Sequence, residues 1–342
     1  MNLKWVVSPF LLFLLFLNNA SAQNIGFKQV IITTEPNRPL SVAIWYPTHQ
    51  VGPLVTAGEN PAFIGTQVIK NATIDVKSAP VVLLSHGYRG NWRNLNWLAS
   101  ALAHKGYIVA APDHPGTTTF DHAPAKAAKW WLRVLDISHV LDYLLSNEQW
   151  KNGINRSDIS AVGHSLGGWT VMQLAGAVFD RQTFKQQCSL YPGPRTCGLA
   201  NELGLEEAQE NEPASGTLYD SRIKRVVSLD LGMARSFSPS SLNAVHHPVL
   251  ILAAGIDIGD LPQALESGYL AEQLPLSLRR YKVYEQATHF SFIQLCKQGA
   301  VSLLEEEVPG DGVICKDGKG SKRSDLHQQI FNDVLTFLLS PD

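Results

Sequence analysis

A short glycine-framed segment around Ser165 carries the residue types needed for nucleophilic chemistry. Residues 163–168 read Gly-His-Ser-Leu-Gly-Gly and fit the pattern G-x-S-x-G. They follow an apolar run at 159–162, which predicts a strand, and precede a helix-compatible run at Trp169–Phe179. In this setting a tight turn raises the serine hydroxyl above the sheet, and the helix start directs N–H groups at developing negative charge. The segment therefore predicts Ser165 as a nucleophile.

A histidine base must accompany this serine, because a hydroxyl is a weak nucleophile at neutral pH. In strand–turn–helix sites of this kind the order along the chain is Ser, then Asp or Glu, then His. His289 follows a predicted strand at Arg280–Tyr284, so we expect it to be the base. His327 lies within a C-terminal helix pattern at Leu326–Leu339, and we expect it at the surface.

The acid that orients the base has more than one candidate. Asp257 follows a predicted strand at residues 249–254, and Asp230 ends the preceding strand at Val226–Leu229. Both positions lie at the carboxyl edge of a parallel sheet, where ligands bind. We favour Asp257, keep Asp230 as the alternative, and place Asp260 third.

Two backbone N–H groups should form an oxyanion hole. One belongs to Leu166, the residue after the nucleophile, and the other comes from the loop after an early strand. That loop is residues 85–90, Ser-His-Gly-Tyr-Arg-Gly, in which Tyr88 occupies the expected position. Gly87 allows close backbone approach, and His86 is expected to hold the loop by hydrogen bonds rather than to react.

The ends of the chain and its composition indicate an exported protein. Of 342 residues, the first 22 combine Lys4, an apolar core and an Ala-Ser-Ala cleavage site, the pattern of a signal peptide. Residues 23–342 are then expected to form one domain without stable membrane insertion. The formal net charge of −2, with no basic patch, argues against a nucleic-acid partner. The expected location is the periplasm or the medium.

Four cysteines lie in the part of the chain that would be exported. An even number in an oxidising compartment predicts two disulfides. Four cysteines allow three pairings, and we favour Cys188–Cys197 and Cys296–Cys315, because each pair closes a local, loop-like segment. Their spacings fit no zinc pattern, so no metal site is expected.

The rest of the sequence alternates predicted strands and helices, which indicates an α/β fold with a mostly parallel central sheet and helices on both faces. Residues 47–79 are rich in Pro, Gly and Asn and predict a long surface loop. The polar segment 180–222 interrupts the alternation. It is either a partial cap over the site or a surface segment that is held in place by a disulfide.

Four segments together resemble a known group of enzymes. They are residues 85–88 (Ser-His-Gly-Tyr), 110–116 (Ala-Ala-Pro-Asp-His-Pro-Gly), 163–168 and 288–290 (Thr-His-Phe). The chain is similar over most of its length to the bacterial predicted dienelactone hydrolases of the α/β-hydrolase superfamily. That group is related to platelet-activating factor acetylhydrolase and to secreted lipases and cutinases.

The resemblance implies a serine esterase, although true dienelactone hydrolases use a cysteine. For the acid, likeness to the acetylhydrolases implies Asp230, and likeness to the lipases and cutinases implies Asp257.

The residues and the resemblance together predict a serine hydrolase that cleaves carboxylic esters through an acyl-enzyme, with no cofactor and no metal. Its partner is expected to be a small-molecule or lipid ester. A phospholipase or acetylhydrolase acting on lipids is the nearest alternative. An amidase or peptidase would share the triad, and a non-catalytic binding protein would be expected to lack part of it. The oligomeric state and the acyl and alcohol preferences are left open by the sequence.

Overall fold

The computed structural model describes residues 24–33, 38–193, 195–214, 218–258 and 261–340. The predicted signal peptide lies outside the described residues. Within these ranges, no helix is both long and apolar enough to cross a membrane.

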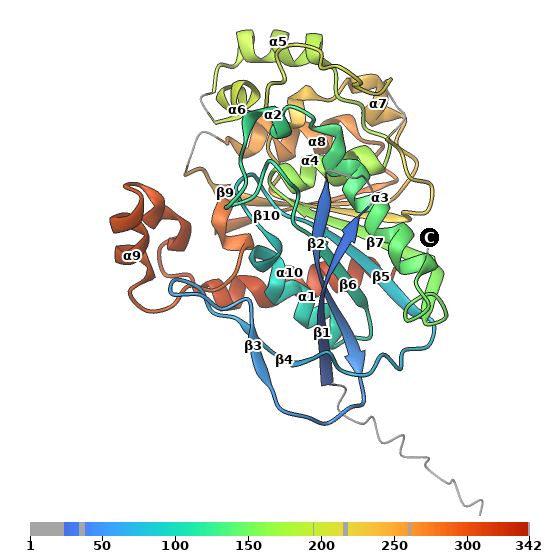
Figure 1. Cartoon of the computed structure of the whole chain (residues 1–342). Helices are drawn as coiled ribbons and strands as arrows, with labels where there is room; N and C mark the ends of the chain where they lie inside the picture. The colour runs from blue at the N-terminus through green and yellow to red at the C-terminus, as the bar shows by residue number, and fades with distance from the viewer. Residues whose placement is uncertain (1–23, 34–37, 194, 215–217, 259–260, 341–342) are drawn as a thin grey trace, which may run out of the picture.

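The described strands form a single twisted sheet at the centre of the molecule (Figure 1). Its spatial order is β10-β9-β8-β7-β5-β6-β2-β1-β4-β3. Strands β5 to β10 run parallel to one another, and β2 pairs antiparallel with both β6 and β1. The strands are β1 (Asn24–Thr33), β2 (Pro39–Thr48), β3 (Val55–Ala57), β4 (Thr66–Lys70), β5 (Ala79–Ser85), β6 (Ile108–Pro112), β7 (Ile154–His164), β8 (Arg225–Leu229), β9 (Val249–Ile256) and β10 (Arg279–Thr288).

Helices cover both faces of this sheet, as the sequence predicts. Helices α1 and α10 pack with one apolar cluster, while α3, α4 and α8 pack with the other. The α-helices are α1 (Asn96–Ala103), α2 (Pro124–Ala127), α3 (Trp131–Ser146), α4 (Leu166–Leu174), α5 (Arg181–Leu190), α6 (Thr196–Glu202), α7 (Pro239–Asn243), α8 (Ser267–Gln273), α9 (Ala300–Glu307) and α10 (Arg323–Leu338).

Buried apolar runs explain why the middle strands form. Strand β8 is buried at every position, and β5 and β9 are buried along most of their length. Continuous apolar runs of this kind are typical of parallel strands that are covered on both faces. The carboxyl ends of β5, β7, β8, β9 and β10 therefore meet at one edge of the sheet.

One prediction about the early chain is partly wrong. The segment 47–79 is not only a loop, because it contains β3 and β4. Strand β4 pairs with β1 through Gly26 and Ile69, and β3 pairs with β4. This edge pairing depends on the position of β1, a long-range contact that the local Pro, Gly and Asn content does not reveal.

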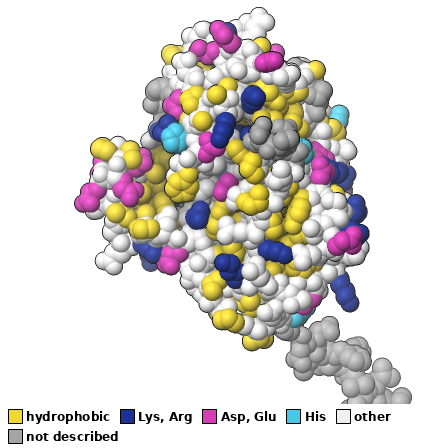
Figure 2. Space-filling view, in the orientation of Figure 1, with side chains coloured by type: hydrophobic (Ala, Val, Ile, Leu, Met, Phe, Trp, Pro, Cys, Tyr) yellow, Lys and Arg dark blue, Asp and Glu magenta, His cyan; other side chains and the backbone are white. Residues whose placement is uncertain are grey.

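Both favoured disulfides are present. Cys188 bonds to Cys197 within the segment 180–222, and Cys296 bonds to Cys315 near the C-terminal part of the chain. The second bond closes the segment 296–315 that contains α9, and α9 projects from the body in Figure 1. Acidic side chains gather on this projecting segment in Figure 2.

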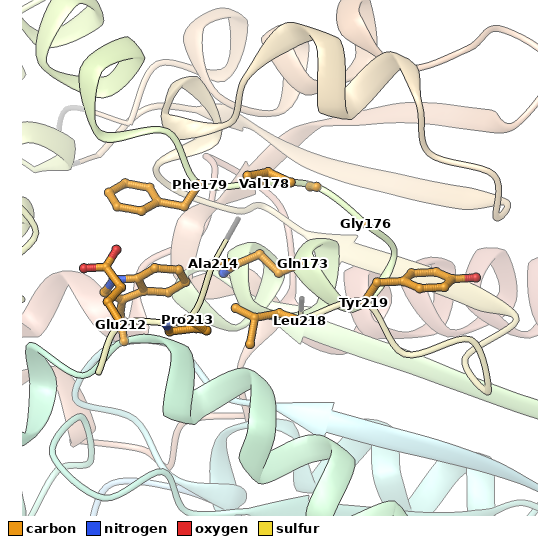
Figure 3. Close-up of a pocket in the computed structure, with 11 residues that line it drawn as sticks. Gln173, Gly176, Val178, Phe179, Glu212, Pro213, Ala214, Leu218 and Tyr219 are labelled. Atoms are coloured by element: carbon orange, nitrogen blue, oxygen red, sulfur yellow. The ribbon is translucent and has the colours of Figure 1, made fainter. Parts of the chain in front are cut away.

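The segment 180–222 folds into α5 and α6 and packs against the body. A small cavity of about 30 Å³ lies between residues 173–179 of the body and residues 212–214, 218 and 219 of this segment. Figure 3 shows Phe179, Gln173 and Leu218 turned toward it. Since the volume suits about one water molecule, this cavity is a packing defect rather than a substrate pocket.

Candidate active site

The sequence-predicted site residues converge on the carboxyl edge of the sheet. Tyr88 lies in the loop after β5, and Ser165 directly follows β7. Asp230 directly follows β8, and His289 directly follows β10. Because these strands are parallel neighbours in one sheet, residues far apart in sequence are brought to one place.

Ser165 sits on a tight turn with a strained backbone. Its φ of 56° and ψ of −123° lie in a region that non-glycine residues rarely adopt. The turn leaves no room for side chains at the flanking glycines. A Cβ on Gly163 would lie 2.0 Å from the Gly167 carbonyl oxygen, and one on Gly167 would lie 1.9 Å from the Ser85 carbonyl oxygen. Strain of this kind is typical of functional sites.

His289, the candidate base, and Asp230, a candidate acid, form one short hydrogen bond. Nδ1 of His289 lies 2.6 Å from Oδ2 of Asp230, and the side chains are 12% and 9% exposed. The other oxygen, Oδ1, accepts the backbone N–H of Ala254 at 2.8 Å. Asp230 itself has a φ of 45°, in the left-handed region. With Nδ1–H donated to the carboxylate, Nε2 of His289 is left as the basic nitrogen.

The preference for Asp257 is therefore corrected. Asp257 is exposed, and its Oδ1 accepts the N–H of Leu261 at 3.0 Å. Strand β9 continues to Ile256, where it pairs with Thr288, so Asp257 leaves the sheet beyond the level of the base. The third candidate, Asp260, lies outside the described residues.

His164 was not among the residues predicted from the sequence. Its ring contacts the backbone of His289, the candidate base. Its Nε2 lies 2.9 Å from the backbone oxygen of His289, and the two rings are 4.7 Å apart. Burial, and then the nearby His289, hold the pKa of His164 well below its usual value. The neutral ring donates Nε2–H to that carbonyl. The available indication in the sequence was its position as the first x of the G-x-S-x-G pattern, directly before Ser165.

The loop after β5 faces the serine. A Cβ on Gly87 would lie 3.1 Å from the Cβ of Ser165, so the glycine permits this approach. His86 holds the loop, as predicted, because its Nδ1 lies 2.7 Å from the Gly87 oxygen and its Nε2 accepts the N–H of His114 at 3.0 Å. Burial keeps the pKa of His86 well below its usual value, so the ring is neutral.

The two predicted oxyanion donors are not used elsewhere. Within the described part of the chain, the N–H groups of Tyr88 and Leu166 donate to no backbone carbonyl among the turn and loop bonds. Leu166 opens α4, so its N–H also lies at the positive end of that helix. These donors are therefore free to bind a developing oxyanion.

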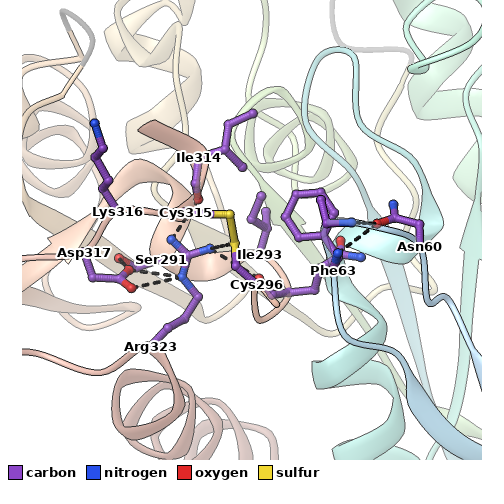
Figure 4. Close-up of a disulfide and its surroundings, with 12 residues drawn as sticks. Asn60, Phe63, Ser291, Ile293, Cys296, Ile314, Cys315, Lys316, Asp317 and Arg323 are labelled. Atoms are coloured by element: carbon purple, nitrogen blue, oxygen red, sulfur yellow. Dashed lines mark hydrogen bonds and ion pairs between the residues drawn. A yellow bond between two sulfur atoms is a disulfide. The ribbon is translucent and has the colours of Figure 1, made fainter. Parts of the chain in front are cut away.

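A second network, also unpredicted, fixes the turn that carries His289 (Figure 4). The hydroxyl of Ser291 accepts the N–H of Thr288 at 2.8 Å and donates to Asp317 at 2.5 Å. Arg323 pairs with Asp317 at 3.1 Å and donates to the oxygen of Ile314, next to the Cys296–Cys315 bond.

His327 is not the surface residue that the sequence predicted. It is buried, and its Nε2 lies 3.1 Å from the Ser291 oxygen and 2.9 Å from the Ile293 oxygen. Its ring stacks on Trp97 at 3.7 Å. His327 therefore holds the end of the His289 turn. The helical pattern alone could not distinguish this inward position from an exposed one.

The segment 180–222 touches the site at two sides. Glu202, at the end of α6, pairs with Arg89 of the Tyr88 loop at 3.5 Å. At the start of α6, Thr196 donates to Glu266, whose other oxygen accepts the N–H of Ala234 at 2.7 Å. The segment thus bridges the oxyanion loop and the loop that follows Asp230.

No metal site is evident in the described ranges, since no group of three or more His, Cys, Asp or Glu side chains is placed to hold an ion.

Residues 77–186 match the family model described as serine aminopeptidase, S33. The match runs from before β5 into α5, so it contains Tyr88 and Ser165 but ends before Asp230 and His289.

Two cutinases from Thermobifida alba, est1 and est2, are each 27% identical to the chain over 130 residues. The est1 match covers 36% of this chain and 41% of the relative. The chain thus spans about two fifths of the length of the cutinases it matches.

A solved structure supports the architecture over nearly the whole chain. A ferulic acid esterase from Streptomyces cinnamoneus superposes with a TM-score of 0.61 at 18% identity, covering 94% of this chain and 90% of that one. Together with the strand order and the turn at Ser165, this likeness shows that the protein has the α/β-hydrolase fold.

Proposed function

We propose that this protein is a carboxylic ester hydrolase that uses Ser165 as nucleophile, His289 as base and Asp230 as orienting acid. The observation that carries the proposal is the 2.6 Å contact between His289 and Asp230. It lies at the sheet edge where the strained turn presents Ser165. Nucleophile, base and acid thus occupy the chain order typical of this fold.

The geometry supports a two-step reaction. Ser165 Oγ attacks the ester carbonyl carbon while Nε2 of His289 takes the hydroxyl proton. Asp230 holds the required tautomer and stabilises the imidazolium that forms. The N–H groups of Tyr88 and Leu166 bind the oxyanion. The alcohol leaves with the proton from His289, and an acyl-Ser165 remains. Water then gives its proton to His289 and releases the acid, which restores the hydroxyl of Ser165.

The names of the matching proteins favour an ester over an amide as the substrate of this protein. The matching proteins are named as cutinases and a ferulic acid esterase, although the family model is described as an aminopeptidase. Asp230 occupies the position expected from the likeness to platelet-activating factor acetylhydrolases. A lipid-ester substrate therefore stays the nearest alternative. The complete set of catalytic groups argues against a binding protein.

The test is hydrolysis of p-nitrophenyl esters, from acetate to palmitate, by residues 23–342 and by the Ser165→Ala variant. We expect hydrolysis by the wild type and loss of activity in the variant. The optimum chain length distinguishes an esterase from a lipase. Aminoacyl p-nitroanilides, tested in parallel, would reveal a peptidase. A folded protein that cleaves none of the esters would contradict the proposal.

We further propose export to the periplasm or the medium. The two disulfides support it, because such bonds persist in oxidising compartments. The test is fractionation of cells that express the full chain or a chain lacking residues 2–22. Export of the full chain alone is expected, and equal cytoplasmic retention of both would contradict it.

A further inference from the structure

Arg133 is a buried cation that the catalytic mechanism does not use. It lies on α3 and is 2% exposed. Burying a charge is costly unless it is paired or fully hydrogen-bonded. Among the described residues, no carboxylate forms an ion pair with its guanidinium, and the nearby Asp136 pairs with Arg38 and His114 instead. A charge kept in such a place needs an explanation.

The guanidinium instead bonds to neutral groups around the oxyanion loop. Nη2 donates to the backbone oxygen of His86 at 2.5 Å and to the Ser85 hydroxyl at 3.3 Å. Nη1 donates to the Thr117 hydroxyl at 2.5 Å, and Thr117 in turn accepts the N–H of Arg89 through its backbone oxygen. Arg133 therefore contacts the loop directly before Tyr88 and reaches Arg89, after Tyr88, through Thr117.

The first oxyanion donor lies in the peptide unit next to the one that Arg133 holds through the His86 oxygen. The side chain of His86 bonds to the Gly87 oxygen at 2.7 Å, and Gly90 donates to that same oxygen at 3.0 Å. The Gly87 carbonyl and the Tyr88 N–H belong to one planar peptide unit. Fixing the carbonyl therefore fixes the direction of the N–H.

A further bond reaches the second donor. Nε of Arg133 donates to the hydroxyl of Thr170 at 3.1 Å, and that hydroxyl donates to the backbone oxygen of Leu166 at 2.8 Å. Thr170 and Leu166 lie on the first turns of α4. One side chain thus connects the two segments that supply the oxyanion donors.

We propose that Arg133 is a positioning residue for the oxyanion hole. It fixes the positions of the Tyr88 and Leu166 N–H groups relative to each other and keeps a positive charge near them. Both roles matter mainly when negative charge develops on the substrate. Preorganised donors and fixed charge stabilise such a transition state without reorganisation. Burial lowers the pKa of Arg133, to about 9, so the group is charged at neutral pH.

The Arg133 proposal rests on the proposed function, and the experiment separates the two. Wild type, Arg133→Lys, Arg133→Gln and Arg133→Met are compared in kcat, in KM and in affinity for an aryl boronic acid, which mimics the tetrahedral state. Arg225→Met is the matched control, because Arg225 is also buried but lies where β8 begins, at the opposite edge of the sheet.

We expect Arg133→Met and Arg133→Gln to lose about 100-fold in kcat and a similar factor in boronic acid affinity, with KM nearly unchanged, as when one oxyanion donor is removed. Arg133→Lys, which keeps the charge, should lose clearly less. Arg225→Met should be less stable but equally active per folded molecule.

Two outcomes would overturn the Arg133 proposal. In one, folded Arg133 variants match Arg225→Met in kcat. In the other, KM rises by the same factor by which boronic acid affinity falls, which indicates general disruption of the site. Failure of the proposed function looks different, because the wild type itself would neither hydrolyse esters nor bind the boronic acid.

Discussion

Nδ1 of His289 lies 2.6 Å from Oδ2 of Asp230, although the two residues are 59 positions apart and follow different strands. Strand β9 separates β8 from β10 in the sheet, so the contact spans a neighbouring strand. The amide of Ala254 on β9 binds the other carboxylate oxygen, which directs Oδ2 toward the imidazole. The pair is therefore positioned by the sheet itself.

The first prediction compares the two aspartates. Asp230→Asn should lower kcat by about 10⁴-fold, because an amide no longer fixes the imidazole tautomer. Asp257→Asn is the matched control, since Asp257 is exposed and lies after the neighbouring strand. Its kcat should stay close to that of the wild type. Steady-state kinetics on one p-nitrophenyl ester measure both values of kcat. A larger loss of kcat in Asp257→Asn than in Asp230→Asn would make Asp257 the orienting acid.

The second prediction concerns the disulfide beside the His289 turn. Replacing Cys296 and Cys315 by serine should cost about 2–4 kcal/mol of stability. It should also lower kcat, because the bond joins the two segments that supply Ile293 and Asp317 to that turn (Figure 4).

The other disulfide supplies its control. Replacing Cys188 and Cys197 by serine alters only the connection between α5 and α6, so kcat should be retained more fully. Equal kcat values for the two double variants, measured below their unfolding temperatures, would argue against a link between the Cys296–Cys315 bond and the base.

The third prediction concerns pH and Glu266. Burial raises the pKa of Glu266 from 4.5 to about 7. Facing it are the Thr196 hydroxyl, the Ala234 N–H, Arg235 at 4.0 Å and, at longer range, Asp230. Because the folded state binds this proton more tightly than the unfolded state, Glu266 lowers stability as the pH rises from about 4.5 to 7. The linked change is about 3 kcal/mol.

Denaturant unfolding across this pH range, for wild type and Glu266→Gln, measures the effect. The variant cannot ionise at this position, so it should lack this component of the pH dependence. Its stability at acidic pH should stay close to that of the wild type, because the amide oxygen can accept the Ala234 N–H while the amide nitrogen donates to the Thr196 hydroxyl. If the free energy of unfolding changed with pH identically in the two proteins, Glu266 would be excluded as a source of the pH dependence.

The fourth prediction concerns Gly167, two residues after the candidate nucleophile. Gly167→Ala should destabilise the protein by at least about 3 kcal/mol, because its Cβ would lie 1.9 Å from the Ser85 backbone oxygen, which cannot move freely. Gly198→Ala is the control, since it also lies in a helix but nothing surrounds its Cβ within 4 Å. That variant should gain up to about 1 kcal/mol. Thermal unfolding of both provides the comparison.

The places of Ser165, His289 and the Tyr88 loop at one edge of the sheet could be predicted because each carries a local signal. Ser165 lies in a spaced glycine motif between a strand and a helix, and His289 follows the last apolar strand. The acid could not be chosen in the same way. Asp230 and Asp257 both follow strands, and only the register of β9 against β10 shows which one reaches the imidazole.

The supporting residues were missed for a related reason. Arg133 and Asp136 are charged residues on a helix, and such residues are usually exposed. They lie, however, three residues apart on the side of α3 that also buries Val134 and Ile137. A charged residue within an apolar stripe was the available signal. The partners of Arg133 lie at the end of β5, in the loops after β5 and β6, and within α4, and they could be identified only from the fold.

The most direct test of the whole account is to find the acyl group on Ser165. The protein is mixed with a p-nitrophenyl ester, quenched in acid within the first turnover, and digested for mass spectrometry. We expect the acyl group on the peptide that contains Ser165, and no modified peptide in Ser165→Ala. Acylation of another residue, or hydrolysis that persists in Ser165→Ala, would contradict it.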